Sequence, residues 1–366
     1  MRTIAIDARK YQDFGIGTYI QHLLNQLGRL ATSHSFLVYA FPNDVDKIRV
    51  GDSMRVVPVS YGKYSFKEIG LLGFKARREG VDVFHAPHYT LPIGLRGHSV
   101  VTIHDLIHLR FPELFGFARS GVAHAMIRHA VSNAGAVIVD SAFVKQDLVE
   151  LFRVEEKNIN VVHLGVHDDF FRSIAQEGVD DFRRRFRLHQ PMLLFVGNLK
   201  AHKGIQILFK AVQIVRQSIP AVQLVLAGSA LAQSPDIVRL IQQLNIAQHV
   251  QGVDFLSPQD LLHAYRAADV FVLPSQYEGF GFPALEAMAA GTPTIVSNAG
   301  SLPEVVGRAA MIFETGNAEE LADLITEVLS NSSLRSQLKY QGIEQARKFD
   351  WSETAQKTLR VYESLL

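Results

Sequence analysis

The stretch Leu273-Pro-Ser-Gln-Tyr-Glu-Gly-Phe-Gly-Phe-Pro-Ala-Leu-Glu-Ala-Met-Ala-Ala-Gly-Thr-Pro-Thr-Ile-Val296 decides the fold, because it reads as strand, glycine-rich turn, short helix and strand. The apolar run Val270–Leu273 at its start is typical of a parallel strand that is buried on both faces. Pro283 suits the beginning of a helix, and Gly291 suits the position just past its end. Strand, helix and strand in this order indicate a βαβ unit.

The turn between strand and helix has the features of an anion site. Gly279 and Gly281 allow unusual backbone angles and the close approach of a ligand to the main chain. A helix N-terminus offers unpaired N–H groups and a positive dipole end, which favour a phosphate. Glu286 lies one turn inside the helix, where its carboxylate could accept hydrogen bonds from ligand hydroxyls. The stretch therefore predicts a site for phosphate and sugar together; the alternative is an ordinary turn in an α/β core.

Apolar strand-like runs alternate with helical patterns along the whole chain, which predicts βαβ units and parallel sheets. The runs form two series, so we expect two doubly wound domains, each with a ligand crevice at the carboxyl ends of its strands. The polar segment 172–190 lacks strand character and is the expected hinge. The predicted strands are 3–6, 36–40, 81–84, 100–103, 136–139 and 160–163, then 192–196, 222–226, 270–273, 294–296 and 310–313.

Length and composition limit the class of protein. A chain of 366 residues favours two domains, and 48% hydrophobic with 20% charged residues argues against disorder. A net charge of +1 gives no general case for nucleic-acid binding. The absence of cysteine excludes disulfides and thiolate chemistry. No apolar run approaches the ~20 residues that span a bilayer, and the chain opens on a strand rather than a signal peptide. We expect a soluble, cytoplasmic protein, or one attached to the inner face of a membrane.

Glu278 and Glu286, eight positions apart around Gly-Phe-Gly-Phe-Pro, resemble the paired-glutamate motif of the retaining nucleotide-sugar glycosyltransferases of family 4. Gly300-Ser-Leu-Pro-Glu-Val-Val306 continues the resemblance, which covers nearly the whole chain. It implies the GT-B fold, with two facing Rossmann-like domains, parallel sheets and an interdomain cleft. The implied domains are an acceptor domain at 1–175 and a donor domain at 188–350. The helix 351–366 would pack back on the first domain, although from sequence alone it could equally belong to the second.

The segment Phe195-Val-Gly-Asn-Leu-Lys-Ala-His-Lys-Gly204 follows the first strand of the second domain. By resemblance Lys203 is the diphosphate-binding lysine, whose ammonium would neutralise charge on the departing nucleotide diphosphate. The family often has an arginine where this chain has Asn198. Lys200 or His202 could supply the second cation, and we expect Lys200; the alternative is that both lie on a solvated loop.

The resemblance also assigns the rest of the donor site. Glu278 would position sugar hydroxyls, Glu286 would hold the ribose hydroxyls, and backbone amides after Glu278 would stabilise the diphosphate. Main-chain groups of 253–256 would flank the nucleotide base. The donor-binding residues expected here are Val253, Phe255, Gly279, Phe280, Gly281, Phe282 and Glu286.

Two segments of the first domain carry further candidates. In Asp13-Phe-Gly-Ile-Gly-Thr-Tyr19, before the helical pattern 19–30, Gly15 and Gly17 would let amides approach the diphosphate. A tight turn is the alternative. In Val100-Val-Thr-Ile-His-Asp-Leu-Ile-His108, His104 lies at the carboxyl end of a buried strand. The resemblance implies that His104 touches the transferred sugar near its reacting carbon, and the alternative is a histidine that caps a strand end.

Two weaker acceptor candidates are Asp105 and Ser141. Asp105 would hold the loop or contact acceptor groups. Ser141 suits a helix N-cap, and the resemblance adds a minor ligand role.

The histidines of His85-Ala-Pro-His88 together with His104 and His108 raise the alternative of a zinc site. Neither pair has a third ligand in a known metal pattern. The resemblance implies no metal and no cofactor, the nucleotide sugar itself being a substrate.

The resemblance implies transfer of a hexosyl unit from a nucleotide diphosphate sugar to an acceptor hydroxyl, with retention at the anomeric carbon. The segments Thr102-Ile-His-Asp-Leu, Phe111-Pro-Glu113 and Gly197-Asn-Leu-Lys look most like bacterial mannosyl- and rhamnosyltransferases of surface-polysaccharide assembly, which makes GDP-mannose the leading donor. UDP- or dTDP-sugars are alternatives. The expected acceptor is a saccharide or a polyprenyl-diphosphate-linked saccharide, read by loops 60–67 and 111–119.

Two other classes of protein remain open. One is another enzyme on the same architecture, such as an epimerase or a phosphorylase, and the other is a non-catalytic nucleotide-sugar-binding assembly subunit, which Asn198 favours.

Two basic-aromatic clusters, 74–78 and 182–187, fit contact with anionic lipid, but solvated helix faces are the more ordinary interpretation.

Overall fold

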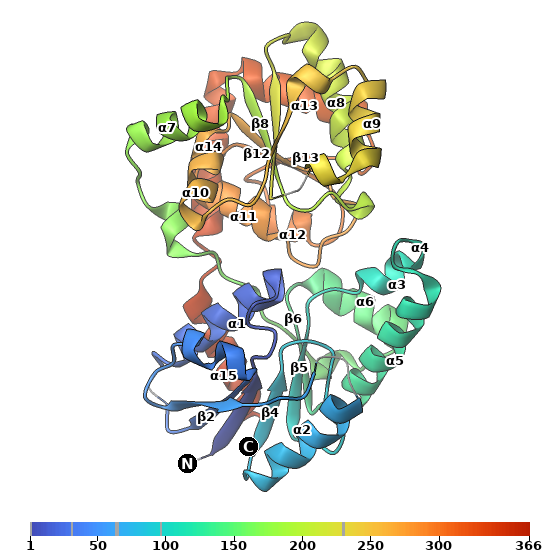
Figure 1. The fold of residues 1–366 in the computed structure, drawn as a ribbon, viewed down its shortest axis with the longest axis vertical. Helices are drawn as coiled ribbons and strands as arrows, with labels where there is room; N and C mark the ends of the chain where they lie inside the picture. Colours follow the sequence, from blue (N-terminus) through green and yellow to red (C-terminus); the bar gives the residue numbers. More distant parts are fainter. Residues whose placement is uncertain (1, 31, 63–65, 96, 229–230) are drawn as a thin grey trace. The chain divides into compact units, whose positions relative to one another are not determined.

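The computed structural model describes residues 2–30, 32–62, 66–95, 97–228 and 231–366, with the backbone alone at 66–69. The chain folds into two compact units (Figure 1). Unit 1 comprises Met1–Gly165 and Asp350–Leu366, and unit 2 comprises Val166–Phe349. Each unit is an α/β fold around one parallel sheet, as the sequence predicts.

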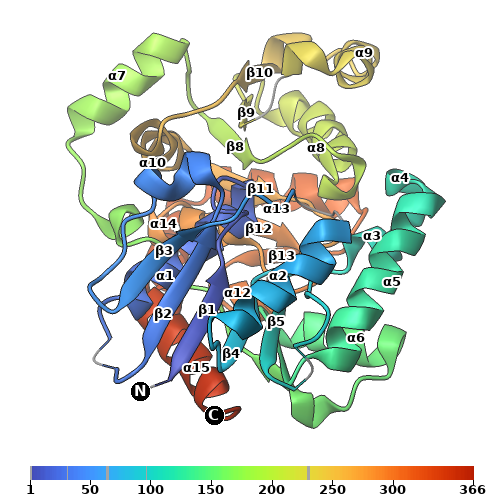
Figure 2. The same ribbon diagram turned by 60° about the horizontal axis from the view of Figure 1, so that its bottom comes forward.

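In the described part of unit 1 the sheet has seven parallel strands in the order β3-β2-β1-β4-β5-β6-β7, and Figure 2 shows β3 to β5 side by side. Its central strands are buried along their length, which explains their continuous apolar sequences. The strands are β1 (Thr3–Asp7), β2 (Ser35–Ala40), β3 (Met54–Pro58), β4 (Val83–Ala86), β5 (Ser99–Ile103), β6 (Ala136–Val139) and β7 (Ile159–Val161). The helices are α1 (Phe14–Leu27), η1 (Pro42–Lys47), α2 (Phe66–Arg78), α3 (Ile107–Arg110), α4 (Pro112–Phe115), α5 (Phe117–Asn133), α6 (Ala142–Phe152), η2 (Glu156–Asn158) and α15 (Trp351–Glu363).

The described part of unit 2 holds a six-stranded parallel sheet in the order β10-β9-β8-β11-β12-β13. Its strands are β8 (Met192–Val196), β9 (Gln223–Ala227), β10 (Val250–Val253), β11 (Val270–Leu273), β12 (Thr294–Ser297) and β13 (Met311–Phe313). Its helices are η3 (Asp168–Phe171), α7 (Gln176–Phe186), η4 (Ala201–Lys203), α8 (Ile205–Ser218), η5 (Leu231–Gln233), α9 (Pro235–Gln243), η6 (Ala247–His249), α10 (Pro258–Ala267), α11 (Phe282–Ala289), α12 (Leu302–Val306), α13 (Ala318–Ser330) and α14 (Ser332–Ala346).

Both sheets reverse their strand order at one point. In unit 1 the chain moves outward from β1 to β2 and β3, then returns to β4 on the other side of β1. In unit 2 it moves from β8 to β9 and β10, then returns to β11 on the other side of β8. Ligands of open α/β sheets bind outside the carboxyl ends of the strands at such a point. The loops that follow β8 and β11 therefore adjoin each other where unit 2 has its expected crevice.

The sequence does not predict two of the edge strands. β3 and β10 each end one sheet, and both mix buried with exposed positions. A strand with only one neighbour is partly solvated, so its sequence does not form the continuous apolar run that marks the buried strands.

The expected hinge at 172–190 is wrong in part, because the segment contains α7, whose Val179 and Phe182 are buried in unit 2. Unit 1 ends at Gly165 rather than at residue 175. The reason lies in η3, which is fastened to unit 2. The Phe170 ring lies edge-on to Tyr265, with ring centroids 5.8 Å apart, and the Arg266 guanidinium donates to the backbone of Phe170.

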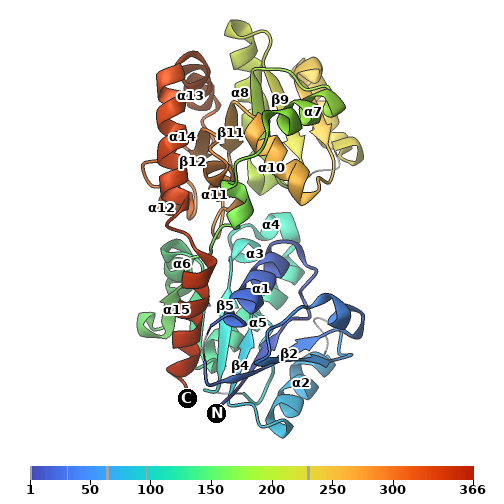
Figure 3. The same ribbon diagram turned by 90° about the vertical axis from the view of Figure 1, so that its left-hand side faces the viewer.

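The chain's last helix belongs to unit 1, where α15 packs against α1 (Figure 3). Asp350 is its N-cap, accepting a hydrogen bond from Ser352 N at 2.7 Å. Among the helices that the structure describes, none has the length and apolar character needed to cross a membrane.

Candidate functional site

The two loops at the switch point of unit 2 are joined through their backbones. Gly204 ends η4 with φ 67°, and a Cβ atom there would lie 1.9 Å from the carbonyl oxygen of Pro274. Gln276 N donates to the carbonyl of His202 at 2.7 Å. Only glycine allows this approach, so the loop after β8 is held against the loop after β11.

Lys203 and Glu278 meet between these loops. Lys203 Nζ lies 2.7 Å from Glu278 Oε1, and Ser275 Oγ donates to the same oxygen at 2.6 Å. Ser301 Oγ donates to the backbone carbonyl of Glu278 at 3.0 Å. A Cβ on Gly300 would lie 2.5 Å from that carbonyl oxygen, so the backbone is packed there as well. The carboxylate is buried and fixed, beside an ammonium that can meet an anion.

The N-terminus of α11 lies directly beyond Glu278. Gly281 is the N-cap, with φ 101°, and Pro283 lies in the first turn, as the sequence predicts. Phe280 is buried, and its ring packs edge-to-face on Phe282 and Phe349 at 5.6 and 5.8 Å between centroids. The Phe280 side chain is therefore part of the packing under the turn. Gly279 is half-buried beside it.

Glu286 lies one turn into α11 and faces Tyr265. Tyr265 Oη donates to Glu286 Oε2 at 2.8 Å, and the tyrosine is itself fully buried against Phe271. Burial raises the pKa of the Glu286 carboxyl to about 7. The group thus changes charge close to neutral pH.

The two candidates for a second cation, both on the loop after β8, differ in their exposure. Lys200 is exposed, and its backbone N–H donates to Asn198 Oδ1 at 3.3 Å, so Asn198 helps to shape the loop. His202 is buried, which excludes it from a solvated loop.

The expected base site has one buried and one exposed member. Val253 is buried at the end of β10, and its carbonyl accepts from Gly228 N at 3.1 Å. Phe255, just beyond, has 75% of its surface exposed. An exposed aromatic ring of this kind is a suitable surface for a nucleotide base.

The two candidate glycines of unit 1, Gly15 and Gly17, lie inside a helix rather than before one. α1 begins at Phe14, not near Tyr19, because Gly17 N already donates to the Asp13 carbonyl. A Cβ on Gly17 would lie 2.5 Å from the Tyr11 carbonyl oxygen, so this glycine serves packing. Gly15 is exposed and leaves the first turn open, because a Cβ placed on it would have no neighbouring atom within 4 Å.

His104 lies after β5, next to the end of β6. Its Nδ1 is 2.7 Å from Asp140 Oδ2, and its Nε2 is 3.2 Å from the Pro87 carbonyl oxygen. Burial alone would lower the pKa of His104, but the charge and hydrogen bond of the Asp140 carboxylate raise it above the ordinary value. Tyr19 of α1 packs edge-on against the ring, with centroids 4.9 Å apart.

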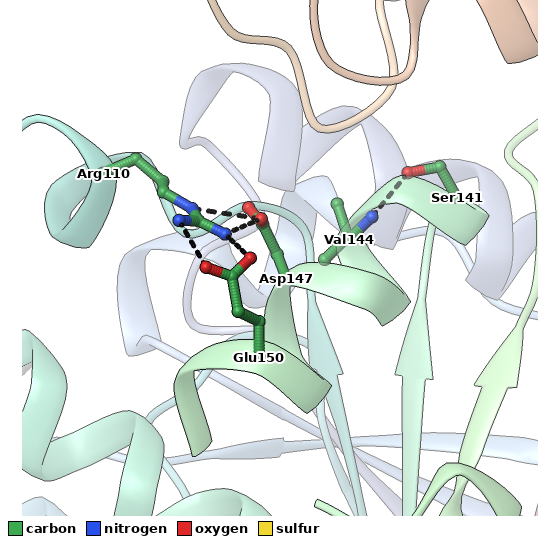
Figure 4. A network of polar contacts seen from close by, with 5 residues as sticks. All are labelled: Arg110, Ser141, Val144, Asp147 and Glu150. Atoms are coloured by element: carbon green, nitrogen blue, oxygen red, sulfur yellow. Dashed lines mark hydrogen bonds and ion pairs between the residues drawn. The ribbon is translucent and has the colours of Figure 1, made fainter. Parts of the chain in front are cut away.

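Hydrogen bonds and ion pairs hold the segment that follows His104. Asp105 is exposed and accepts from Ile107 N at 3.1 Å, which starts α3. Ser141 Oγ accepts from Val144 N at 3.2 Å and caps α6, as expected (Figure 4). Figure 4 also shows that Arg110 of α3 pairs with two carboxylates of α6, those of Asp147 and Glu150. The predicted acceptor loop at 60–67 lies partly outside the described residues.

Several residues of these sites are not evident from the sequence. Asp140 follows β6 directly, as His104 follows β5, so adjacent strand ends are a usable signal. The sequence carries no such signal for Tyr265 and Ser275, because each acts only through a side chain that the fold brings next to it. At the end of β1, Arg9 forms a buried two-point ion pair with Asp7.

The histidine cluster does not form a metal site among the residues that the structure describes, where no group of three or more suitable ligands occurs. Both ring nitrogens of His85 have partners: Tyr362 Oη at 2.7 Å and Thr102 Oγ1 at 2.8 Å. His108 packs its ring on Phe115 at 4.2 Å between centroids.

Comparison with known families covers most of the chain. Residues 15–170 match the family described as Glycosyltransferase Family 4, and residues 178–345 match Glycosyl transferases group 1. O-antigen chain mannosyltransferase B of Escherichia coli is 27% identical over 77% of this chain and 74% of its own length. D-inositol 3-phosphate glycosyltransferase of Corynebacterium glutamicum is 27% identical over 96% of this chain and 92% of its own.

Solved structures share the fold over the full length. A sucrose-phosphate synthase from Thermosynechococcus elongatus has a TM-score of 0.80 at 23% identity, covering 100% of this chain and 99% of its own. Anabaena HepE in complex with UDP and glucose has a TM-score of 0.78 at 18% identity, covering 100% of both chains.

Proposed function

Since the chain belongs to the glycosyltransferases of family 4 and has the GT-B fold, we propose that it moves a hexosyl unit from a nucleotide diphosphate sugar to an acceptor hydroxyl. The observation that carries this proposal is the Lys203–Glu278 pair, fixed beside the N-terminus of α11 at the switch point of unit 2. A cation, a helix N-terminus and a carboxylate at one point suit a diphosphate with a sugar attached.

In the proposed reaction the bond between the anomeric carbon and the diphosphate oxygen breaks, and the bond to the acceptor oxygen forms on the same face. Because the bond forms on the face from which the diphosphate leaves, configuration is retained, and the acceptor proton passes to the departing diphosphate. Lys203 and the amides after Glu278 neutralise the charge that develops on the diphosphate, without a metal or cofactor. Glu278 holds sugar hydroxyls, Glu286 holds the ribose, and the open first turn at Gly15 allows a close backbone approach.

GDP-mannose is the donor that we propose, for transfer to a saccharide or lipid-linked saccharide in surface-polysaccharide assembly. The similarity to an O-antigen chain mannosyltransferase supports mannose. The similarity to HepE, which was solved with UDP and glucose, supports a UDP-sugar as the alternative. Phe255 provides an exposed ring for the base in either case.

A thermal-shift panel against GDP-mannose, UDP-sugars, dTDP-rhamnose and the free nucleotides tests the donor, because a ligand of the folded state raises the unfolding midpoint.

Donor turnover by wild-type protein and by Lys203→Ala then tests the reaction. We expect kcat to fall about a hundredfold, on the scale of losing one oxyanion donor. Lys210→Ala, at an exposed position of α8, is the matched control and should retain most activity. Donor binding without turnover by the wild type would instead favour an assembly subunit.

Peripheral contact with a membrane is a further part of the proposal. In α2, Phe74 has 65% of its surface exposed beside the basic residues Lys75, Arg77 and Arg78. The second basic-aromatic cluster is a weaker candidate than its sequence indicates, because Phe182 is buried and Arg183 donates to the Ala267 carbonyl. Flotation with anionic vesicles tests α2: binding should weaken with salt and with Phe74→Ser, and an absence of binding at low salt contradicts it.

A further inference from the structure

His104 is held between two hydrogen-bond acceptors. One is the Asp140 carboxylate, 2.7 Å from Nδ1, and the other is the Pro87 carbonyl oxygen, 3.2 Å from Nε2. A carbonyl oxygen accepts and cannot donate, so the contact with Pro87 requires a proton on Nε2. The contact with Asp140 requires a second proton between Nδ1 and the carboxylate. The pair therefore holds two protons, one more than a neutral histidine beside an ionised aspartate.

Burial makes loss of that second proton costly. Asp140 is 2% exposed, and within the described residues its Oδ1 is buried and has no hydrogen-bond partner. The buried negative charge of the Asp140 carboxylate is thus balanced chiefly by the ring of His104. Deprotonation would leave a net negative charge buried at the end of β6, which is unfavourable in a medium of low polarity.

The other groups around the pair do not reverse this balance. Asp105 adds a second carboxylate on the same loop, which favours a cationic ring. Burial raises the pKa of the Asp140 carboxyl, and the His104 ring, with a smaller contribution from His163 after β7, acts against that rise and favours the ionised carboxylate. Tyr19 presents its ring from α1, and burial raises the pKa of its hydroxyl beyond the working range. His85 of β4 is neutral, because burial lowers its pKa to about 3.

We propose that Asp140 is a positioning residue that keeps His104 doubly protonated near neutral pH, so that a cationic N–H rather than a lone pair faces the substrate. The proposal rests on the proposed function for its catalytic meaning. The 3.2 Å contact with Pro87 is the longer of the two, so a substrate oxygen can take the place of that carbonyl on Nε2. His104 then acts as a hydrogen-bond donor to an oxygen of the transferred sugar or the diphosphate, and it does not serve as a general base.

Nitrogen NMR of the imidazole rings in the full chain tests the protonation state without any substrate. At pH 7.5 we expect protons on both ring nitrogens of His104, with the signal assigned by its loss in His104→Gln. Asp140→Asn keeps the size of the side chain and removes its charge, and should lower the pKa of His104 by at least one unit. Asp105→Asn, which removes an exposed carboxylate from the same loop, is the matched control and should shift it by less than half a unit. A neutral His104 in the wild type at pH 7.5 overturns the proposal.

Kinetics separate positioning from a purely structural role. In the wild type kcat should fall at alkaline pH as His104 loses its proton, and Asp140→Asn should move that fall to lower pH by at least one unit while the donor KM changes less than threefold. A uniform loss of activity with an unmoved pH profile would assign Asp140 to stability alone. If no donor is turned over, the proposed function fails, but the NMR result still decides the protonation of His104.

Discussion

Glu286 is a carboxyl group that titrates near neutral pH, since burial raises its pKa to about 7 from an ordinary value of 4.5. Between these values the folded protein binds more protons at this site than the unfolded chain does. Its favourable contribution to stability is therefore complete below pH 4.5 and is lost as the pH rises through 7. In the proposed donor site, binding of the nucleotide would have the opposite preference, because the ionised form of Glu286 is the better acceptor of ribose hydroxyls.

The first prediction concerns the pH dependence of nucleotide binding at Glu286. Affinity for a nucleoside diphosphate should rise between pH 6 and pH 8 and approach about a tenfold loss per pH unit below the pKa of Glu286. Glu286→Gln should bind more weakly and keep only the shallower dependence that comes from the ligand's own terminal phosphate, whose second pKa is about 6. Titration calorimetry at pH 6, 7 and 8 measures both proteins. Equal pH dependence in wild type and variant would remove Glu286 from the nucleotide site.

The second prediction separates the steric role of a glycine from its backbone conformation. Gly204 and Gly316 both have positive φ, at 67° and 93°, but only Gly204 has an atom, the Pro274 carbonyl oxygen, in the place of a Cβ. Gly204→Ala should cost on the order of 3 kcal/mol or more of stability, and Gly316→Ala about 1 kcal/mol, from φ alone. Denaturant unfolding of each variant gives the two values. Similar costs would mean that the loop after β8 moves freely away from Pro274.

At this scale the sequence predicts a residue well when its partner is the backbone and poorly when its partner is a distant side chain. Gly281, Pro283 and Ser141 are found where local conformation requires them. Tyr265 is not predicted, because an aromatic residue on a helix reads as core until Glu286 is seen beside it.

Among the elements, burial on both faces decides which strands are recognisable. β5 and β11 are enclosed by neighbours and helices, and their apolar runs predict them within a residue or two. β3 and β10 lie at sheet edges and carry polar positions, so apolar continuity misses them. The start of α1 is missed for another reason, since Gly15 and Gly17 read as a loop although the helix already begins at Phe14 and Gly17 packs closely on the Tyr11 carbonyl.

The third prediction tests how α15 is anchored to unit 1. Tyr362 Oη forms a 2.7 Å hydrogen bond with Nδ1 of His85, a buried and neutral ring. Tyr362→Phe keeps the ring and leaves that nitrogen unsatisfied, at an expected cost of about 1–3 kcal/mol. Tyr340→Phe, at a position that is 69% exposed, should change stability by less than about 0.5 kcal/mol. Calorimetric unfolding of both variants makes the comparison, and equal midpoints would show that the hydroxyl adds nothing to the anchor.

The whole molecule divides by chain continuity as well as by packing. Unit 2 is one uninterrupted segment, Val166–Phe349, whereas unit 1 is completed by Asp350–Leu366 from the far end of the chain. Two series of strands in the sequence predict two units. No periodicity assigns the last helix, because its partners are as far as 277 positions away, as in the pair Tyr362 and His85.

The fourth prediction follows from this division. Ending the chain after Phe349 removes α15 and with it attachments to unit 1 such as the Trp351 ring on His22, the Thr354 hydroxyl on the His163 carbonyl, and Tyr362 on His85. Hydrogen exchange followed by mass spectrometry should show lost protection across the unit 1 strands while the unit 2 strands stay protected. Ending the chain after Glu363 keeps all of α15 and is the matched control, expected to exchange like the full chain. Loss of protection in both units together would show that they unfold as one cooperative body, and α15 would then stabilise the whole protein rather than unit 1.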